Sequence, residues 1–205
     1  MLKSAPPAPP ARGFSLIELM VVLSIMALLV MAAMPSFSTW VRNVKVRAVA
    51  DDLQNALRTA QAEAVRRSRQ MVFVRTGGAT DAVSSLSASA DGARWAIVAL
   101  PLGEGNSAAI VEVGALGDAA AGVSITGSAN ALCFNSLGRL TANASVSTSV
   151  ANAGCTVSGG GSGAEFDITV NGADKPLKVT VALGGQVRLC DPAFTLSADT
   201  PYGCP

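Results

Sequence analysis

A single carboxylate lies near the start of a long apolar segment. Glu18 is the only ionisable side chain between Phe14 and Met34. A charge at the centre of a bilayer costs roughly 2 to 3 kcal/mol, and less near an interface, unless it is paired. If the chain is cleaved after Gly13, the new amine of Phe14 stands about one helical turn before Glu18. In a stack of such helices, the Glu18 carboxylate of one subunit could pair with the Phe14 amine of its neighbour and fix their axial offset.

Few other side chains could catalyse a reaction. The 205 residues contain no histidine, which excludes His-containing catalytic triads and His-ligated metal sites. Asp51 and Asp52 are adjacent on a predicted helix, while Glu165 and Asp167 alternate on a predicted strand, so neither pair is brought to a cleft. Gly159 to Gly163 lacks the Lys-Ser/Thr of a phosphate-binding loop. We therefore predict a structural or binding protein, with no enzymatic activity, cofactor or metal.

The four cysteines lie in the last 73 residues and form no C-x-x-C motif, which weakens a zinc or thioredoxin-like interpretation. An even number of cysteines after a membrane segment suits disulfides in an oxidising compartment. Three pairings are possible, and we favour Cys133 with Cys155 and Cys190 with Cys204, because each closes a short loop. The second would also anchor the tail, Asp191 to Pro205. Each bridge is expected to contribute about 2 to 4 kcal/mol.

Length and composition allow one domain and an anchoring element. The net charge is +1 and only 14% of residues are charged, so the chain has no overall attraction to nucleic acid. Half of the residues are apolar, but aromatics make up 4%. The core should therefore be modest and built mainly from Val, Leu and Ile.

The segment from Phe14 to Met34 can cross a bilayer, because 21 helical residues span about 31 Å. Lys3, Arg12 and four prolines precede it, forming a short basic tail that cannot be helical. Positive charge before the span places the N-terminus in the cytoplasm and the rest of the chain across the membrane.

Three simpler interpretations compete for this segment. A cleaved secretory signal would have a shorter apolar region and a small-x-small site, and Ala32-Ala33-Met34-Pro35 is a poor one. A plain signal anchor leaves the cost of Glu18 unexplained. A buried helix of a soluble core is improbable for such a continuous apolar run.

The N-terminus resembles that of the type IV prepilin family. The family's processing motif stands here as Arg12-Gly13-Phe14-Ser15-Leu16-Ile17-Glu18. The resemblance implies cleavage between Gly13 and Phe14 by prepilin peptidase, which also methylates the Phe14 amine. It also implies that Pro35 is the proline that kinks the helix in many such proteins.

The chain after Pro35 is expected to continue as a helix and then form strands. Apolar residues recur at three- and four-residue steps between Ser36 and Gln70, which predicts an amphipathic helix and, counted from Phe14, a rod of roughly 85 Å. Short Val/Ile/Leu-rich runs predict an antiparallel sheet. They are residues 71–75, 94–100, 109–113, 122–126, 131–135, 165–170, 177–183 and 186–189. Thr76 to Gly92 and Asn143 to Gly163 are predicted to be long mobile loops.

Later stretches resemble the GspH/FimT/FimU group of minor pilins and pseudopilins. They are residues 62–74, the turn 134–139 and the ending 179–190. The resemblance implies an α+β fold of the type IV pilin kind, a long N-terminal helix packed on an antiparallel β-sheet head. The expected divisions are a cleaved leader (1–13), a transmembrane or filament-core helix (14–35), its amphipathic continuation with the first strand (36–75), and a β-rich periplasmic head with a disulfide-clipped C-terminal tail (76–205).

Charge is distributed unevenly along the chain. Residues 36–75 carry eight basic and three acidic side chains, a net charge of +5, whereas residues 76–205 carry five basic and ten acidic side chains, a net charge of −5. We expect Arg42, Lys45 and Arg47, just outside the membrane, to meet phospholipid headgroups. FimT-like members, which this chain resembles, are associated with DNA uptake through Gly-Arg-x-Arg. The matching residues here are Gly185-Gln186-Val187-Arg188, which lack the first arginine. DNA contact through Arg188, helped by Arg139, is therefore the alternative function, and it would be weak because few phosphates are neutralised.

The sequence thus predicts a minor pilin or pseudopilin, a single-pass protein of the bacterial inner membrane with a periplasmic head. It would prime or cap a filament after leader cleavage and N-methylation. Its partners would be prepilin peptidase, the inner membrane and other pilins. A type IV pilus and a type II secretion pseudopilus use this same N-terminus, so both remain open.

Overall fold

The computed structural model describes residues 14–205 except residue 104 and residues 117–121 and 158–162. The expected leader with Gly13, and most of the glycine-rich stretch 159–163, lie outside the described residues. The chain divides into two compact units, Met1–Ser38 and Thr39–Pro205, and each is described by itself.

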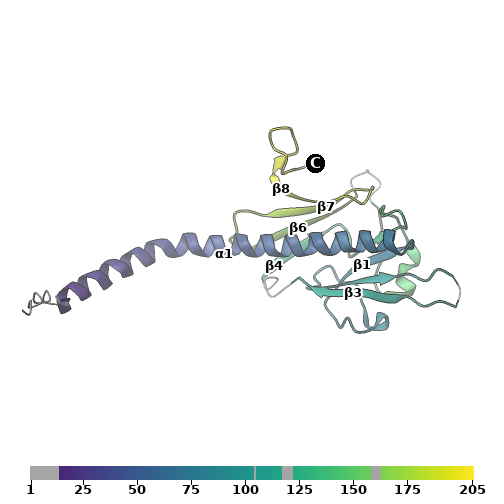
Figure 1. Cartoon of the computed structure of the whole chain (residues 1–205), viewed down its shortest axis with the longest axis horizontal. Helices are drawn as coiled ribbons and strands as arrows, with labels where there is room; N and C mark the ends of the chain where they lie inside the picture. Colours follow the sequence, from purple (N-terminus) through teal and green to yellow (C-terminus); the bar gives the residue numbers. More distant parts are fainter. Residues whose placement is uncertain (1–13, 104, 117–121, 158–162) are drawn as a thin grey trace, which may run out of the picture. The chain divides into compact units, whose positions relative to one another are not determined.

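Among the described elements one long helix comes first, and it is followed by strands and two short 3-10 helices (Figure 1). In chain order they are the helix α1 (Leu16–Arg66), β1 (Met71–Thr76), the 3-10 helix η1 (Val83–Ser85), β2 (Arg94–Ala99), β3 (Ala109–Ala115), β4 (Val123–Gly127), β5 (Ala131–Phe134), the 3-10 helix η3 (Ala144–Thr148), β6 (Ala164–Val170), β7 (Leu177–Val181), β8 (Val187–Thr195) and β9 (Gly203–Cys204). The eight predicted strands are all present, and their ends agree within about two residues except that β8 extends to Thr195 instead of ending at residue 189.

Helix α1 passes through Pro35 without ending, as predicted. It stops at Arg66 rather than at Gln70, because Ser68 adopts a left-handed conformation with φ of 50°. The backbone N–H of Arg69 then donates to the carbonyl of Ala64 over 3.2 Å, which closes the last turn. The chain is thereby turned directly into β1.

The described strands of the second unit form two sheets, where the sequence predicted one antiparallel sheet. One has the strand order β3-β2-β1-β5, and the other has the order β4-β6-β7-β8-β9. Neighbouring strands are antiparallel except β8 and β9, which are parallel. Strand patterning gives the faces of each strand but not its partners, so the split into two sheets was not visible in the sequence.

The main core lies between α1 and one face of both sheets. Buried helix residues at three- and four-residue steps, including Val46, Leu53 and Leu57, pack with Phe73 of β1 and Phe166 of β6. The amphipathic half of the helix is therefore confirmed from Val46 onward.

A second core covers the other face of the first sheet. Alternate residues of β1 separate cleanly, since Met71 and Phe73 enter the main core while Val72 and Val74 enter the second. Every residue of β1 is buried for this reason.

The two long loops were predicted to be mobile, and their described parts are instead packed. Leu86 and Ala88 from the first, and Val146, Val150 and Ala153 from the second, are buried in the second core. The loops look polar in sequence because these buried apolar residues stand singly among small polar ones. Val146 belongs to the 3-10 helix η3, and Leu86 directly follows η1.

One buried cation joins the loop and both sheets. Arg75 of β1 is 2% exposed, and its guanidinium donates to the carbonyls of Gly92 (3.1 and 3.2 Å) and Ile125 (3.2 Å). Ile125 belongs to β4 of the second sheet. Burial lowers the pKa of Arg75, and the nearby charge of Asp91 opposes this shift.

Candidate functional site

Glu18 lies in the first turn of α1 with an exposed side chain. Phe14, which precedes the helix, is 86% exposed. The helix dipole favours a carboxylate in the first turn. None of the ion pairs formed among the described residues includes Glu18.

The apolar part of α1 is long enough to cross a membrane. Its most apolar 18-residue window has a mean hydropathy of 2.6, and none of it is buried within the structure. The Ser24 hydroxyl donates to the carbonyl of Met20 over 2.8 Å, so this polar group is satisfied within the helix and lowers the cost of lipid burial.

The turn between β6 and β7 is fastened to α1 at Asn43. The side-chain oxygen of Asn43 accepts from the backbone N–H groups of Asp174 and Lys175, both over 3.2 Å. Its amide nitrogen donates to the Asp174 carboxylate over 2.5 Å. The neighbouring Arg42 donates to the carbonyl of Gly172 over 3.4 Å.

Of the three cations expected at headgroups, two make contacts within the protein. Arg42 reaches Gly172, and Arg47 lies 3.6 Å from the Asp51 carboxylate in a solvent-exposed pair. Lys45 is half-buried. Headgroup contact by these residues stays a prediction.

Two neighbouring cavities of about 370 and 410 Å³ form a groove beside α1. We call it the helix–tail groove, and its lining combines one edge of α1 with residues of β7, β8 and the C-terminal tail. Arg47, Leu177 and Asp191 line both cavities. Each of the following residues lines one of the two cavities: Trp40, Val44, Asp51, Gln54, Lys175, Leu189 and Tyr202.

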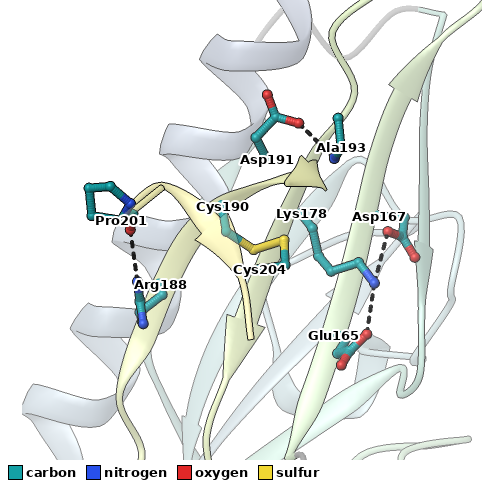
Figure 2. Close-up of a disulfide and its surroundings, with 9 residues drawn as sticks. All are labelled: Glu165, Asp167, Lys178, Arg188, Cys190, Asp191, Ala193, Pro201 and Cys204. Atoms are coloured by element: carbon teal, nitrogen blue, oxygen red, sulfur yellow. Dashed lines mark hydrogen bonds and ion pairs between the residues drawn. A yellow bond between two sulfur atoms is a disulfide. The ribbon is translucent and has the colours of Figure 1, made fainter. Parts of the chain in front are cut away.

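The C-terminal tail is held rigidly beside this groove. Disulfides join Cys133 to Cys155 and Cys190 to Cys204, the scheme favoured from the sequence. Figure 2 shows the Cys190–Cys204 bridge, with Arg188 donating to the carbonyl of Pro201.

Strand pairing and an aromatic contact also brace the tail. Strand β8 runs to Thr195, well past its predicted end, and pairs with β9, which was not predicted. Phe194 and Tyr202 meet edge to face with ring centroids 5.1 Å apart. The tail therefore presents exposed aromatic surface in a fixed shape.

Glu165 and Asp167, two of the carboxylates considered for catalysis, are paired with Lys178. Figure 2 shows the amine of Lys178 on β7 between Glu165 and Asp167 of β6, at 2.9 and 3.5 Å. The hydrogen bond to Glu165 is the main cause of the raised pKa of Lys178. Among the described residues, no group of His, Cys, Asp and Glu side chains has the arrangement of a metal site.

Two turns close in sequence to the residues considered for DNA contact lie against each other. Gly185 has φ of 88°, and a Cβ there would overlap the carbonyl of Gly138, the residue before Arg139. Gln61 of α1 donates to the same Gly138 carbonyl over 3.1 Å. Arg139 is exposed, whereas Arg188 is half-buried and bonded to Pro201, so it is not a fully free cation. DNA contact stays a prediction.

Sequence reasoning missed the helix–tail groove. A usable signal was present, because Phe37, Trp40 and Val44 continue the apolar pattern past Pro35 at three- and four-residue steps. The tail strand β9 gave no such signal, because it consists of only two residues, Gly203 and Cys204.

Comparisons with known proteins match both parts of the chain. A model of the prokaryotic N-terminal methylation motif matches residues 9–34, and a model of type II transport protein GspH matches residues 49–185. A solved structure of the type IV minor pilin FimU of Pseudomonas aeruginosa strain PAO1 is 18% identical with a TM-score of 0.48, covering 81% of this chain and 99% of that one. The minor pseudopilin EpsH of the type 2 secretion system of Vibrio cholerae is 15% identical with a TM-score of 0.45, covering 73% and 99%. Among curated protein sequences, no match was found.

Proposed function

This chain belongs to the type II transport protein GspH family, and we propose that it is a minor pilin or pseudopilin that primes or caps a filament through its N-terminal helix. In this proposal the chain is cleaved between Gly13 and Phe14 and the new amine is methylated. The Phe14 amine of one subunit then pairs with Glu18 of its neighbour. The apolar side chains around them pack laterally in the filament core.

The observation that carries the proposal is the setting of Glu18. It is a carboxylate in the first turn of a helix whose N-terminal apolar part is exposed, within the residues that the methylation-motif model matches. Burying such a carboxylate in lipid or in a helix bundle is unfavourable unless a cation compensates it. The Phe14 amine of an adjoining subunit, which stands about one helical turn before Glu18 in its own chain, supplies that cation. No further basic residue is then needed.

The N-terminal apolar segment is also the basis for the proposed location of the protein. We place residues 1–13 in the cytoplasm as a leader that is removed, residues 14–35 in the inner membrane before assembly, and residues 76–205 in the periplasm. Residues 36–75 connect them as the amphipathic half of the helix and strand β1. The disulfides Cys133–Cys155 and Cys190–Cys204 fit an oxidising compartment.

Mass spectrometry of the protein purified from its host tests the processing step. The expected N-terminal peptide begins with N-methylated Phe14, and an intact leader starting at Met1 would disprove the mechanism. Replacing Gly13 with a bulky residue should leave the leader attached.

The Glu18→Ala variant tests the assembly step. It should insert into the membrane at normal levels, because an apolar side chain only lowers the insertion cost, yet be depleted from the filament fraction. Glu18→Asp is the matched control, since it keeps the charge near the same place. Normal incorporation of Glu18→Ala would refute the pairing. Co-purification with pilus or with secretion components would assign the filament.

A further inference from the structure

We propose that the helix–tail groove seats the helix of one neighbouring pilin-like subunit, which extends lateral packing from the apolar segment onto the head. The inference rests on the proposed function, because it names the partner surface used in the same assembly. It adds a second contact region, remote in sequence from Glu18. The groove residues, rather than the apolar segment, would then discriminate between neighbours.

The helix edge of the groove has the spacing of a helix-packing seam. Apart from Asn43, which is bonded to the β6–β7 turn, its helix lining residues follow steps of four, three, four and three: Trp40, Val44, Arg47, Asp51 and Gln54. Steps that alternate in this way keep side chains facing one partner helix in left-handed packing. Over these residues the seam is about 21 Å long.

The seam is apolar at its start, where it follows the membrane segment in sequence. Trp40 is 59% exposed and Val44 is 47% exposed, large fractions for such side chains. The same steps lead back in the sequence to Phe37 and Ala33. The apolar start of the seam is therefore continuous in sequence with the apolar segment.

The opposite wall is rigid enough to form a seat. Leu177 and Leu189 come from strands β7 and β8, and Tyr202 comes from the tail. Tyr202 is 52% exposed, but its backbone carbonyl accepts from the N–H of Asp191 over 2.9 Å and its ring contacts Phe194. A preformed aromatic wall loses little side-chain entropy on binding, which favours its use as an interaction surface.

The charges of the groove favour a protein helix over a lipid surface. Arg47 and Lys175 are basic, but Asp51 and Asp191 are acidic, and all four line the two cavities. Anionic headgroups would be repelled by the two carboxylates, whereas a helix can present complementary charges of both signs beside an apolar stripe. The partner chemistry is therefore an amphipathic helix with an apolar edge opposite Trp40 and Val44.

Site-specific photocrosslinking in the intact assembly tests the proposal. The full-length chain carries p-benzoylphenylalanine at Val44 or at Tyr202 and is expressed with the rest of its filament machinery. Irradiation should give an adduct at both positions, and mass spectrometry should place the crosslinked peptide in the long helix of a pilin-like subunit. Adducts to lipid, to a protein of another kind or to no partner would overturn the proposal.

A matched pair of substitutions supplies an independent measurement. Val44→Glu should lower the amount of this subunit in the filament fraction by about tenfold or more, as for a central interface residue. Val113→Glu is the control, because Val113 on β3 is 44% exposed and lies outside the groove. Both variants should keep the unfolding temperature of the wild type, which separates assembly from folding.

The comparison with Glu18→Ala distinguishes this inference from the proposed function. If Glu18→Ala is depleted from filaments while Val44→Glu enters normally, the groove proposal is wrong and the proposed function stands. If both variants enter normally, both fail. Depletion of both, with Val113→Glu unaffected, supports both.

Discussion

The side-chain amide of Asn43 on α1 lies 2.5 Å from the carboxylate of Asp174 in the turn between β6 and β7, 131 positions later in the chain. The same Asn43 side chain also accepts two backbone hydrogen bonds from this turn. One short polar residue therefore holds the second sheet against the helix where the groove begins. Lys175 and Leu177, which line that groove, follow directly from the turn.

Asn43→Ala should loosen this attachment and lower the free energy of unfolding by about 1 to 2 kcal/mol, because three hydrogen bonds at a partly exposed site are lost. Urea unfolding of the full-length chain in detergent measures it. Asn55→Ala is the matched control, since Asn55 is an exposed residue of the same helix and gains the same helix propensity. Equal stability of the two variants would contradict a fastening role for Asn43.

Arg75→Met should destabilise the protein by about 2 to 4 kcal/mol. The substitution leaves the carbonyls of Gly92 and Ile125 without their buried donors, and no water can readily replace a guanidinium that is 2% exposed. Thermal unfolding followed by circular dichroism gives the change. Arg94→Met, at an exposed position of β2, should stay within about 0.5 kcal/mol of wild type.

Local sequence patterns predicted most of the helices and strands but few of the contacts between them. The short apolar run of residues 71–75 predicted a strand, yet only the structure shows that both its faces are covered. The second face is covered by Leu86 and Val146, which stand singly among small polar residues and so produce no periodic signal.

Some residues of the candidate site could likewise be recognised from the sequence, and others could not. Glu18 stands out in sequence because a charge in an apolar run is unfavourable anywhere, whatever the fold. Arg75 does not stand out, because the sequence alone gives it the appearance of an exposed basic residue at a strand end. The groove depends on Tyr202 and Trp40 approaching the same cavity system from opposite ends of the chain, which only the fold can reveal.

Replacing Cys190 and Cys204 together with serine should release the tail while leaving the rest of the head folded. The bridge closes a loop with a sequence separation of 14 residues, so its loss should cost about 2 to 4 kcal/mol. Limited proteolysis should then cut first within residues 191–204, whereas the wild-type tail resists. If the inference about the groove is right, this variant also loses the Val44 crosslink.

The pair Cys133 and Cys155 should behave differently from the tail bridge. Both residues are at least 96% buried and belong to the second core, beside Val72 and Val146. Their replacement should lower the unfolding temperature of the whole head rather than free one segment. Selective tail cleavage in the Cys133/Cys155 variant would contradict this division of roles.

Glu63 should make the stability of the helix end depend on pH. Hydrogen bonds from Arg66 and Arg67, at 2.6 to 2.8 Å, lower the pKa of Glu63 from 4.5 to about 2. Because the folded-state pKa is below the unfolded one, the stabilisation is fully present above about pH 4.5 and is lost as the pH falls towards 2. The effect should be about 1 kcal/mol or less, since Arg66 and Arg67 are largely exposed.

The measurement compares the unfolding free energies of wild type and Glu63→Gln across this pH range. Their difference should be largest near neutral pH, shrink below pH 4.5, and decrease at high salt because exposed charges are screened. Replacing Arg66 and Arg67 together with glutamine should remove most of this pH dependence, because the pKa of Glu63 then returns towards its ordinary value. A wild-type advantage over Glu63→Gln that grew on acidification would contradict the sign of this shift.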